Sequence, residues 1–342
     1  MFAGCSRPLL AMATMVVLAG PPLPAQDDPY RSALETYRKG GDMELTVRAL
    51  QGWRRDDFEK AIERFLLRAN RDEIEAAAVL QLEFGLASVA QSASSAQFHL
   101  EAGMRIIRRL TAPYRSQSQF PPDLSGFIRT WLGVAASAFL TINDTKLARP
   151  WIDRAMSLPK SAPTTTLAGI VEEMAANAID PTTNVRSRMD WRRRLAQAAE
   201  IYEQAIALDA SYARAHVRLA HVLLRLDELP RSRSNADRAL ALAQEPVDRY
   251  LGALALGAGL ERQGDLAGAR DAYERALAAA PGAQTATVAL GFVDMMAGRP
   301  QDAQARVTAF VSAPKDDLYW WEFRNGGVDH AGVAWLRARV GR

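Results

Sequence analysis

Amphipathic helical segments recur at a fixed spacing in the second half of the chain. Two stretches, one of which begins at Ala213, each hold two such segments joined by a short turn. Alanines at equivalent places, Ala205 and Ala239, stand 34 residues apart. Ala276 follows after 37, with an insertion around 244–249, and Phe310 follows after another 34. A period of this length is typical of helix-turn-helix units that stack in a row. No useful length of chain alternates apolar and polar residues, so the sequence predicts an all-α protein.

The clearest unit is RYLGALALGAGLERQGDLAGARDAYERALAAAP at 249–281. It places Gly257 on the first helix, Gly264 in the turn, Tyr273 on the second helix and Pro281 at the exit. Small residues let two helices approach, and a neighbouring large side chain fills the groove between them. The pattern closely resembles the tetratricopeptide repeat. This resemblance implies a right-handed superhelical solenoid of antiparallel helix pairs.

The repeat weakens toward the N-terminus. A solenoid is expected over 125–312, clearest over 190–312, after an irregular helical N-terminal region at 26–124. One unit carries an insertion: its first helix is expected at 165–178, followed by an irregular loop at 180–190.

The first 25 residues form a predicted signal peptide. Arg7 precedes an apolar run that ends near Gly20, and a proline-rich stretch leads to a cleavage site after Ala25. The mature chain is therefore expected to be periplasmic or secreted, and it has no apolar run of spanning length. Two alternatives are lipidation at Cys5 and an uncleaved amphipathic or disordered leader. Since Cys5 is the single cysteine, no disulfide is expected in the mature chain.

The sequence contains no recognisable catalytic or metal-binding spacing. The four histidines form no metal-ligand pattern, and His216 and His221, five residues apart on one helix, face different sides. One of the two is expected to pack and the other to face solvent. The adjacent carboxylates Glu172 and Glu173 are interpreted as solvated charge. A formal net charge of +3 does not indicate a nucleic-acid partner. We therefore expect neither an enzyme nor a bound cofactor or metal.

The resemblance implies a concave groove lined by particular positions of each first helix. The predicted groove residues are Arg214, Val217, His221, Leu224, Arg225, Leu254, Glu261, Phe292 and Met295. The same positions include Leu251, Ala258, Arg262, Thr285, Val288 and Met296. Family members that clamp a C-terminal carboxylate carry lysine and asparagine where this chain has Val217 and His221, which argues against such a clamp. An apolar, partly cationic groove suits an amphipathic helix or an extended segment. Alternatively, some of these residues pack against the next repeat.

The C-terminal segment at 313–342 is rich in aromatic residues. Tyr319, Trp320, Trp321 and Phe323 fall within five positions, and a short final helix follows. Terminal repeats need a cover for their apolar face, so a capping role is expected. The alternative is a docking patch that includes Trp320 and Trp321, since tryptophan is favoured at binding hot spots.

These patterns favour a non-enzymatic scaffold of the cell envelope, whose groove binds a helix or an extended segment of a partner protein. Two alternatives stay open. The protein could be an accessory or regulatory subunit of a separate secreted enzyme or adhesion complex, or an enzyme with a site in 26–124.

Overall fold

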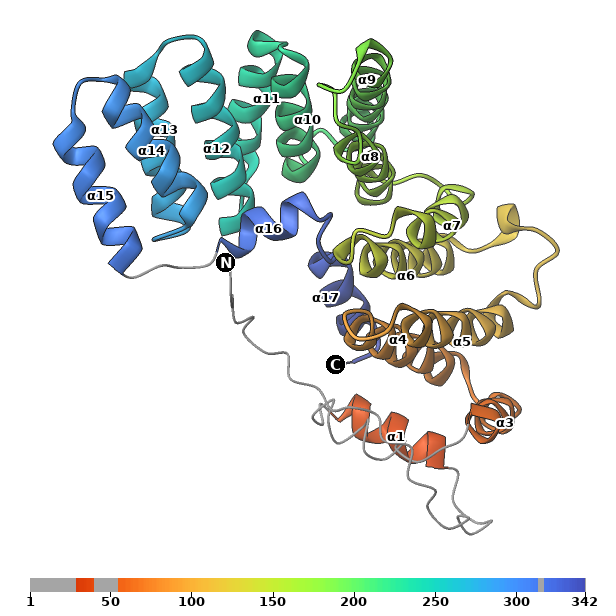
Figure 1. Ribbon diagram of the computed structural model, residues 1–342. Helices are drawn as coiled ribbons and strands as arrows, with labels where there is room; N and C mark the ends of the chain where they lie inside the picture. Colours follow the sequence, from red (N-terminus) through yellow and green to blue (C-terminus); the bar gives the residue numbers. More distant parts are fainter. Residues whose placement is uncertain (1–28, 40–54, 313–316, 342) are drawn as a thin grey trace. The chain divides into compact units, whose positions relative to one another are not determined.

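A computed structural model describes residues 29–39, 55–312 and 317–341, which form sixteen α-helices, one short 3₁₀ helix and no β-strand (Figure 1). The first helices are α1 (Pro29–Arg38), α3 (Arg55–Leu66), α4 (Arg71–Ser88), α5 (Ala93–Thr111), η1 (Gln117–Gln119), α6 (Pro122–Thr141) and α7 (Thr145–Met156). The next are α8 (Ala162–Asn177), α9 (Val185–Leu208), α10 (Ala213–Leu226), α11 (Leu229–Leu242) and α12 (Pro246–Arg262). The last are α13 (Leu266–Ala279), α14 (Gln284–Met296), α15 (Pro300–Ser312), α16 (Leu318–Arg324) and α17 (His330–Arg339). The predicted all-α class is confirmed. The predicted signal peptide lies outside the described residues.

The chain divides into two compact units. Of the described residues, one unit comprises those up to 135 and those at 330–341, and the other comprises those from 136 to 329, so the division falls within α6. The first unit thus contains the final helix α17, and the second contains α16. The domain boundaries expected near residues 124 and 312 remain predictions.

Within the second unit, α8–α15 form a solenoid of antiparallel helix pairs. Each helix packs on the next one along the chain, and the first helices of successive pairs, α8, α10 and α12, also contact one another. The turns of three pairs pass through left-handed residues, with φ of 70° at Asp227, 80° at Gly264 and 74° at Gly298. Glycine adopts this conformation without steric cost. The recurrence of this turn confirms the predicted solenoid.

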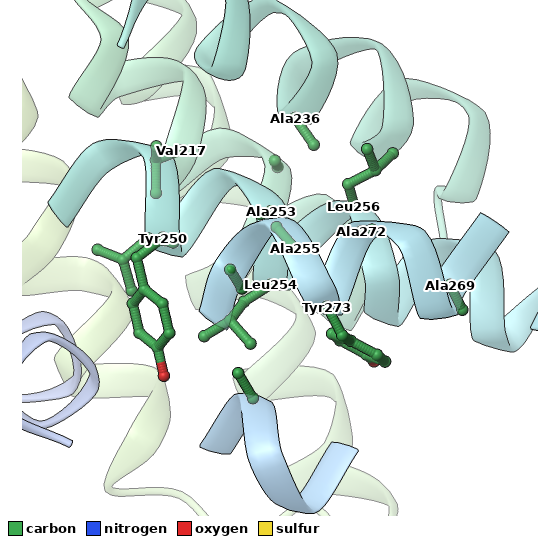
Figure 2. Close-up of a cluster of buried hydrophobic side chains, with 14 of the residues drawn as sticks. Val217, Ala236, Tyr250, Ala253, Leu254, Ala255, Leu256, Ala269, Ala272 and Tyr273 are labelled. Carbon is green, nitrogen blue, oxygen red and sulfur yellow. The ribbon is translucent and has the colours of Figure 1, made fainter. Parts of the chain in front are cut away.

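Gly257 and Tyr273 show how the two helices of the pair α12 and α13 come into close contact. A Cβ on Gly257 would lie 2.5 Å from Cε1 of Tyr273, so only glycine lets α12 approach the ring on α13. Figure 2 shows Tyr273 in the apolar cluster that joins α10 to α13. Gly169 and Tyr202 repeat the relationship between α8 and α9, where a Cβ would lie 2.4 Å from the ring. This small-to-large packing is the feature that the sequence pattern predicts.

The expected first helix at 165–178 corresponds to α8, but the loop expected at 180–190 is partly wrong. Helix α9 begins at Val185, where the Asn184 side chain accepts a hydrogen bond from the backbone N–H of Ser187. An N-cap of this kind satisfies a donor that the first helical turn leaves without a partner. The insertion is therefore mostly an N-terminal extension of the second helix of the pair.

In the first unit, the C-terminal helix α17 binds to α4 through charged groups. Arg337 donates two hydrogen bonds to Glu83, at 2.8 Å each, and Arg339 donates two to Glu75, at 2.6 and 2.9 Å. The hydroxyl of Tyr37 on α1 also donates to Glu83, at 2.7 Å. Fork-shaped arginine–carboxylate pairs are among the strongest polar contacts in proteins, so they fix α17 on α4.

Helix α6 is long and apolar enough to cross a membrane by length and composition, so the expectation that no apolar run reaches spanning length is wrong. However, 78% of its most apolar window is buried within the protein, as expected for a core helix.

Candidate functional site

The segment at 317–329 lies across the first helices of the solenoid in the second unit. It contacts Thr285 of α14 and Tyr250 of α12 at its start, then Arg218 and His221 of α10. Gly326 lies against α8 and α6, because a Cβ there would be 2.7 Å from Leu140 and 3.2 Å from Met174. The backbone N–H of Asp329 donates to the Ser137 hydroxyl at 3.0 Å. The segment therefore crosses these helices in the reverse of their order in the chain. In Figure 1, α16 lies beside α12.

Asp317 fixes the start of α16. Its side chain is buried, and one carboxylate oxygen accepts hydrogen bonds from the Tyr250 hydroxyl at 2.5 Å and from the Thr285 backbone N–H at 2.8 Å. The other oxygen accepts from the Trp320 backbone N–H at 3.1 Å, which caps the helix. Burial and the hydrogen bond to Asp317 raise the pKa of Tyr250 above its usual value, so its hydroxyl remains a donor.

Phe323 anchors the middle of the segment. The Arg218 guanidinium lies over its ring, with Cζ 3.8 Å from the ring centroid. The His221 ring meets Phe323 edge-on at 5.1 Å and Trp320 at 5.8 Å. A cation over an aromatic face is attracted by the ring quadrupole, most strongly where water is excluded. Both Arg218 and Phe323 are buried, so this contact is well suited to hold α16.

Glu173 of α8 is the carboxylate that Arg218 and Arg225 share next to α16. It accepts hydrogen bonds from Tyr202 at 2.8 Å and from Arg218 at 3.3 Å, and it contacts His221 Nδ1 at 2.9 Å. Arg225 approaches the same carboxylate at 3.8 Å. Burial alone would raise the pKa of Glu173, but the Arg218 charge and the His221 contact outweigh burial and lower it to about 2. Glu173 is therefore an anion at neutral pH.

A cavity of about 150 Å³ remains between α16 and the groove. It is lined by Val217, His221, Leu224, Leu251, Leu254, Ala255, Ala258, Tyr273, Thr285, Ala289, Trp320 and Phe323. Most of these side chains are apolar, and helices of the solenoid contribute them together with α16. The structure therefore has a partly filled apolar groove at this position.

The structure brings together part of the predicted groove. Among the predicted residues, Val217, His221, Leu224, Leu254 and Trp320 all line the cavity. So do Leu251, Ala258 and Thr285, which occupy the same repeat positions.

The remaining predicted groove residues are placed differently. Arg214 pairs with Asp248 at 3.4 Å, and Arg225 belongs to the Glu173 cluster. Glu261 accepts a hydrogen bond from the Tyr273 hydroxyl at 2.8 Å. Phe292 and Met295 lie on α14 with about half of their surface exposed, at 51% and 54%. Whether any of these residues binds a partner stays a prediction.

Among the described residues, the segment 317–329 does not cover the outer face of the last repeat, as a cap would. Val311 on α15 stays 69% exposed, and Val288, Phe292, Met295 and Met296 of α14 are each more than half exposed. Helix α16 instead directs Trp320 and Phe323 into the groove, whereas Trp321 remains 52% exposed. The two predicted docking tryptophans thus have opposite environments.

Sequence reasoning missed four groups: Glu173, Arg218, Asp317 and Phe323. The expectation that Glu172 and Glu173 are solvated is wrong, because both are buried and paired with arginines. Arg218 lies 45 residues from Glu173, so no local pattern links them. Glu173 and Arg218 lie on the first helices of neighbouring repeats, and this shared repeat position was the only sign in the sequence that they could meet. The two histidines agree with expectation in part: His216 is buried, and His221 is partly exposed but bonded to Glu173.

A second, more open hollow of about 700 Å³ lies between α13 and α15. Its arginines, Arg270 and Arg306, bind the buried carboxylate of Asp294, which also contacts Arg299. The guanidinium groups of Arg270 and Arg306 are therefore paired within the protein. Among the described residues, no group of three or more histidine, cysteine, aspartate or glutamate side chains could hold a metal ion.

Comparison with known proteins agrees with the repeat. Residues 260–325 match the family model of the tetratricopeptide repeat, and no curated protein matches. Among solved structures, MamA (41-end) from Desulfovibrio magneticus RS-1 is 14% identical, covering 54% of this chain and 94% of its own, with a TM-score of 0.42. The apo form of RapI is 12% identical over 91% of this chain and 85% of its own, with a TM-score of 0.47. TTC0263, a thermophilic protein of Thermus thermophilus, is 19% identical over 58% and 92%, with a TM-score of 0.38.

Solenoids of this type present extended concave surfaces that serve as interaction scaffolds. The match over 260–325 places a tetratricopeptide repeat in that part of the chain, and the helix pairs of α8–α15 have the helix-turn-helix arrangement of such repeats.

Proposed function

We propose that this protein is a non-enzymatic interaction scaffold of the cell envelope, which binds a helix or an extended segment of a partner protein in the groove of α10, α12 and α14. The observation that carries the proposal is the occupancy of this groove by α16. A short aromatic helix already lies there, held by Asp317 and Phe323. The groove is therefore suited to peptide side chains by shape and by chemistry.

The lining supports a protein ligand over a small polar one. The cavity walls are mainly leucine, valine and alanine, and polar groups are confined to a few places such as Thr285 and His221. Apolar lining with a few fixed polar groups is typical of surfaces that bind an amphipathic helix. The sequence also contains no recognisable metal-ligand or catalytic motif.

The envelope location rests on the predicted leader. A positive charge, an apolar run and a small residue at Ala25 favour export and cleavage. Intact mass and N-terminal sequencing of protein recovered from the periplasm or the medium test this part. A mature chain that begins at Gln26 is expected, whereas an uncleaved chain retained in the cytoplasm would contradict it.

The groove is tested by site-specific photo-crosslinking in the source cells. A photoreactive phenylalanine derivative replaces Ala258, which lines the cavity, or Gln263, which is exposed just after the same helix. We expect one dominant protein adduct from position 258 and none above background from position 263. Equal adducts at the two positions, or none at 258 in a folded protein, would contradict the groove as the binding surface.

A further inference from the structure

We propose that α16 is an internal ligand of the groove, and that the partner binds as a short helix with the same pattern: a carboxylate at the N-cap and aromatic side chains three and six residues later. In this chain the pattern is Asp317, Trp320 and Phe323. The partner then competes with α16 for the same contacts. This inference rests on the proposed function.

The contacts of α16 are those of a ligand. Every helix from α8 to α15 pairs with its neighbours along the chain, whereas α16 is a single seven-residue helix that contacts α12. One side of it, with Trp320 and Phe323, faces the solenoid, and Trp321 on another side is half exposed. A helix that docks by an i, i+3 pair of anchors is a recurring mode of peptide recognition.

Three helices of the solenoid each supply one recognition element. Tyr250 of α12 and the Thr285 backbone N–H of α14 donate to the carboxylate of Asp317. Arg218 of α10 faces the Phe323 ring. A ligand that lacks the carboxylate leaves two donors without their acceptor, and one that lacks the aromatic ring loses the cation–π contact. The distance between α10 and the donors on α12 and α14 therefore determines how far apart a ligand must carry its carboxylate and its aromatic ring.

The fit of α16 is incomplete, which leaves room for a competitor. A cavity of about 150 Å³ remains beside Trp320 and Phe323, although protein interiors are normally filled. A partner that carries a further bulky apolar side chain can occupy this space and gain contacts that α16 does not make. Since α16 is tethered, the partner competes against a high effective concentration.

The test uses a labelled peptide of residues 317–325, DLYWWEFRN, and fluorescence anisotropy with the chain at 26–342. The wild-type chain is compared with a variant in which Trp320→Ala and Phe323→Ala weaken the internal ligand. A chain whose groove is occupied nine-tenths of the time binds about tenfold more weakly than one whose groove is open. We expect the variant to bind the peptide at least about tenfold more tightly than the wild type.

Matched controls use the exposed tryptophan. Trp321→Ala in the chain should leave the Kd of the peptide unchanged, and Trp321→Ala in the peptide should still allow binding. A peptide with Trp320→Ala and Phe323→Ala should not bind. Because the double variant could lose its fold, Asp317→Ala provides a second route: it removes the cap and the contacts to Tyr250 and Thr285, and should increase peptide affinity less.

Equal peptide affinity of wild type and both variants, with circular dichroism unchanged, overturns the inference. It is also overturned if the peptide with both aromatic residues replaced binds as well as the native one. Failure here with specific crosslinking at position 258 leaves the proposed function intact and rejects only α16 as the internal ligand. Loss of the crosslink rejects the proposed function itself.

Discussion

The Arg218 guanidinium is held between a carboxylate and an aromatic ring. Its Nη1 donates to Glu173 of α8 at 3.3 Å, while its Cζ lies 3.8 Å from the centroid of Phe323 on α16. The same side chain thus joins two repeats of the solenoid and binds the segment in the groove. Substitution of Phe323 should therefore loosen α16, whereas substitution of Glu173 should destabilise the solenoid itself.

Replacement of Phe323 by leucine should loosen α16 without unfolding the solenoid. Leucine retains apolar bulk but has no ring for Arg218, and a desolvated cation–π contact contributes about 1–2 kcal/mol. Amide hydrogen exchange over 317–325 should become about 5–30 times faster in the variant. Trp321→Leu, at a half-exposed position on the same helix, should leave these rates near those of the wild type. Equal acceleration in the two variants would show that the ring contact has no special role.

Glu173→Gln should destabilise the solenoid strongly. It leaves Arg218 and its neighbours without their buried anion, and breaking a buried ion pair in this way costs about 3–5 kcal/mol. Glu172→Gln is the matched control, since its partners Arg149 and Arg194 are 50% and 33% exposed and can be solvated. The loss there should be about 1 kcal/mol or less. Urea denaturation at pH 7 measures the free energy of unfolding of both variants. A similar decrease in the two would contradict the special role of Glu173.

The pH dependence of the same carboxylate has a defined sign. Burial opposes its charge, but Arg218 and His221 lower the pKa of Glu173 to about 2 in the folded chain, from a usual value of 4.5. The stabilisation is therefore complete above pH 4.5 and is lost as the pH falls toward 2. Glu173→Gln should remove this part of the acid dependence.

Much of the fold could be predicted, because the repeat is encoded locally. Gly257, Gly264 and Tyr273 are recognisable by spacing alone, and their packing follows from it. The groove positions on α10 and α12 were also predictable for this reason. The extension of α9 was not, since Val185 and Met189 are exposed apolar residues that carry no packing signal.

The occupancy of the groove could not be predicted. It depends on contacts between residues far apart in the chain, such as Tyr250 and Asp317, which are 67 positions apart. By composition, the aromatic segment after the last repeat favoured a cap, with a docking patch as the alternative. The direction of Trp320 and Phe323 into the groove is set by tertiary packing, which composition does not reveal.

His99 should make the first unit sensitive to mild acid. Burial lowers its pKa from 6.5 to about 4, and its Nδ1 lies 3.0 Å from Oε1 of Gln81. The unfolded chain thus takes up a proton before the folded one does. Stability is complete above pH 6.5 and decreases by about 3 kcal/mol as the pH falls to about 4.

His99→Gln tests this assignment because it removes the titrating ring. Hydrogen exchange of α4 and α5 at about pH 7 and about pH 4.5 reports on the first unit directly. The wild type should open more readily at the lower pH, and the variant should respond much less. A variant with the full wild-type dependence would assign the effect to another group. Glu173 loses its stabilisation below pH 4.5, so the two windows barely overlap.

Two glycines on α12 give opposite predictions for the same substitution. A Cβ on Gly257 would lie 2.5 Å from the Tyr273 ring, whereas a Cβ on Gly259 would meet nothing within 4 Å. Gly257→Ala must push the ring away and separate α12 from α13, at a cost of about 1–3 kcal/mol. Gly259→Ala should instead stabilise the helix by up to about 1 kcal/mol, because alanine loses less backbone entropy.

Thermal denaturation of the two variants beside the wild type measures this contrast. Helix propensity alone would predict that both substitutions stabilise, since both replace glycine within a helix. A lower Tm for Gly257→Ala together with an unchanged or higher Tm for Gly259→Ala therefore isolates the contact with Tyr273. If Tyr273→Leu in the Gly257→Ala background then restores part of the loss, the clash is with the ring, because leucine has no atoms at the position of Cε1.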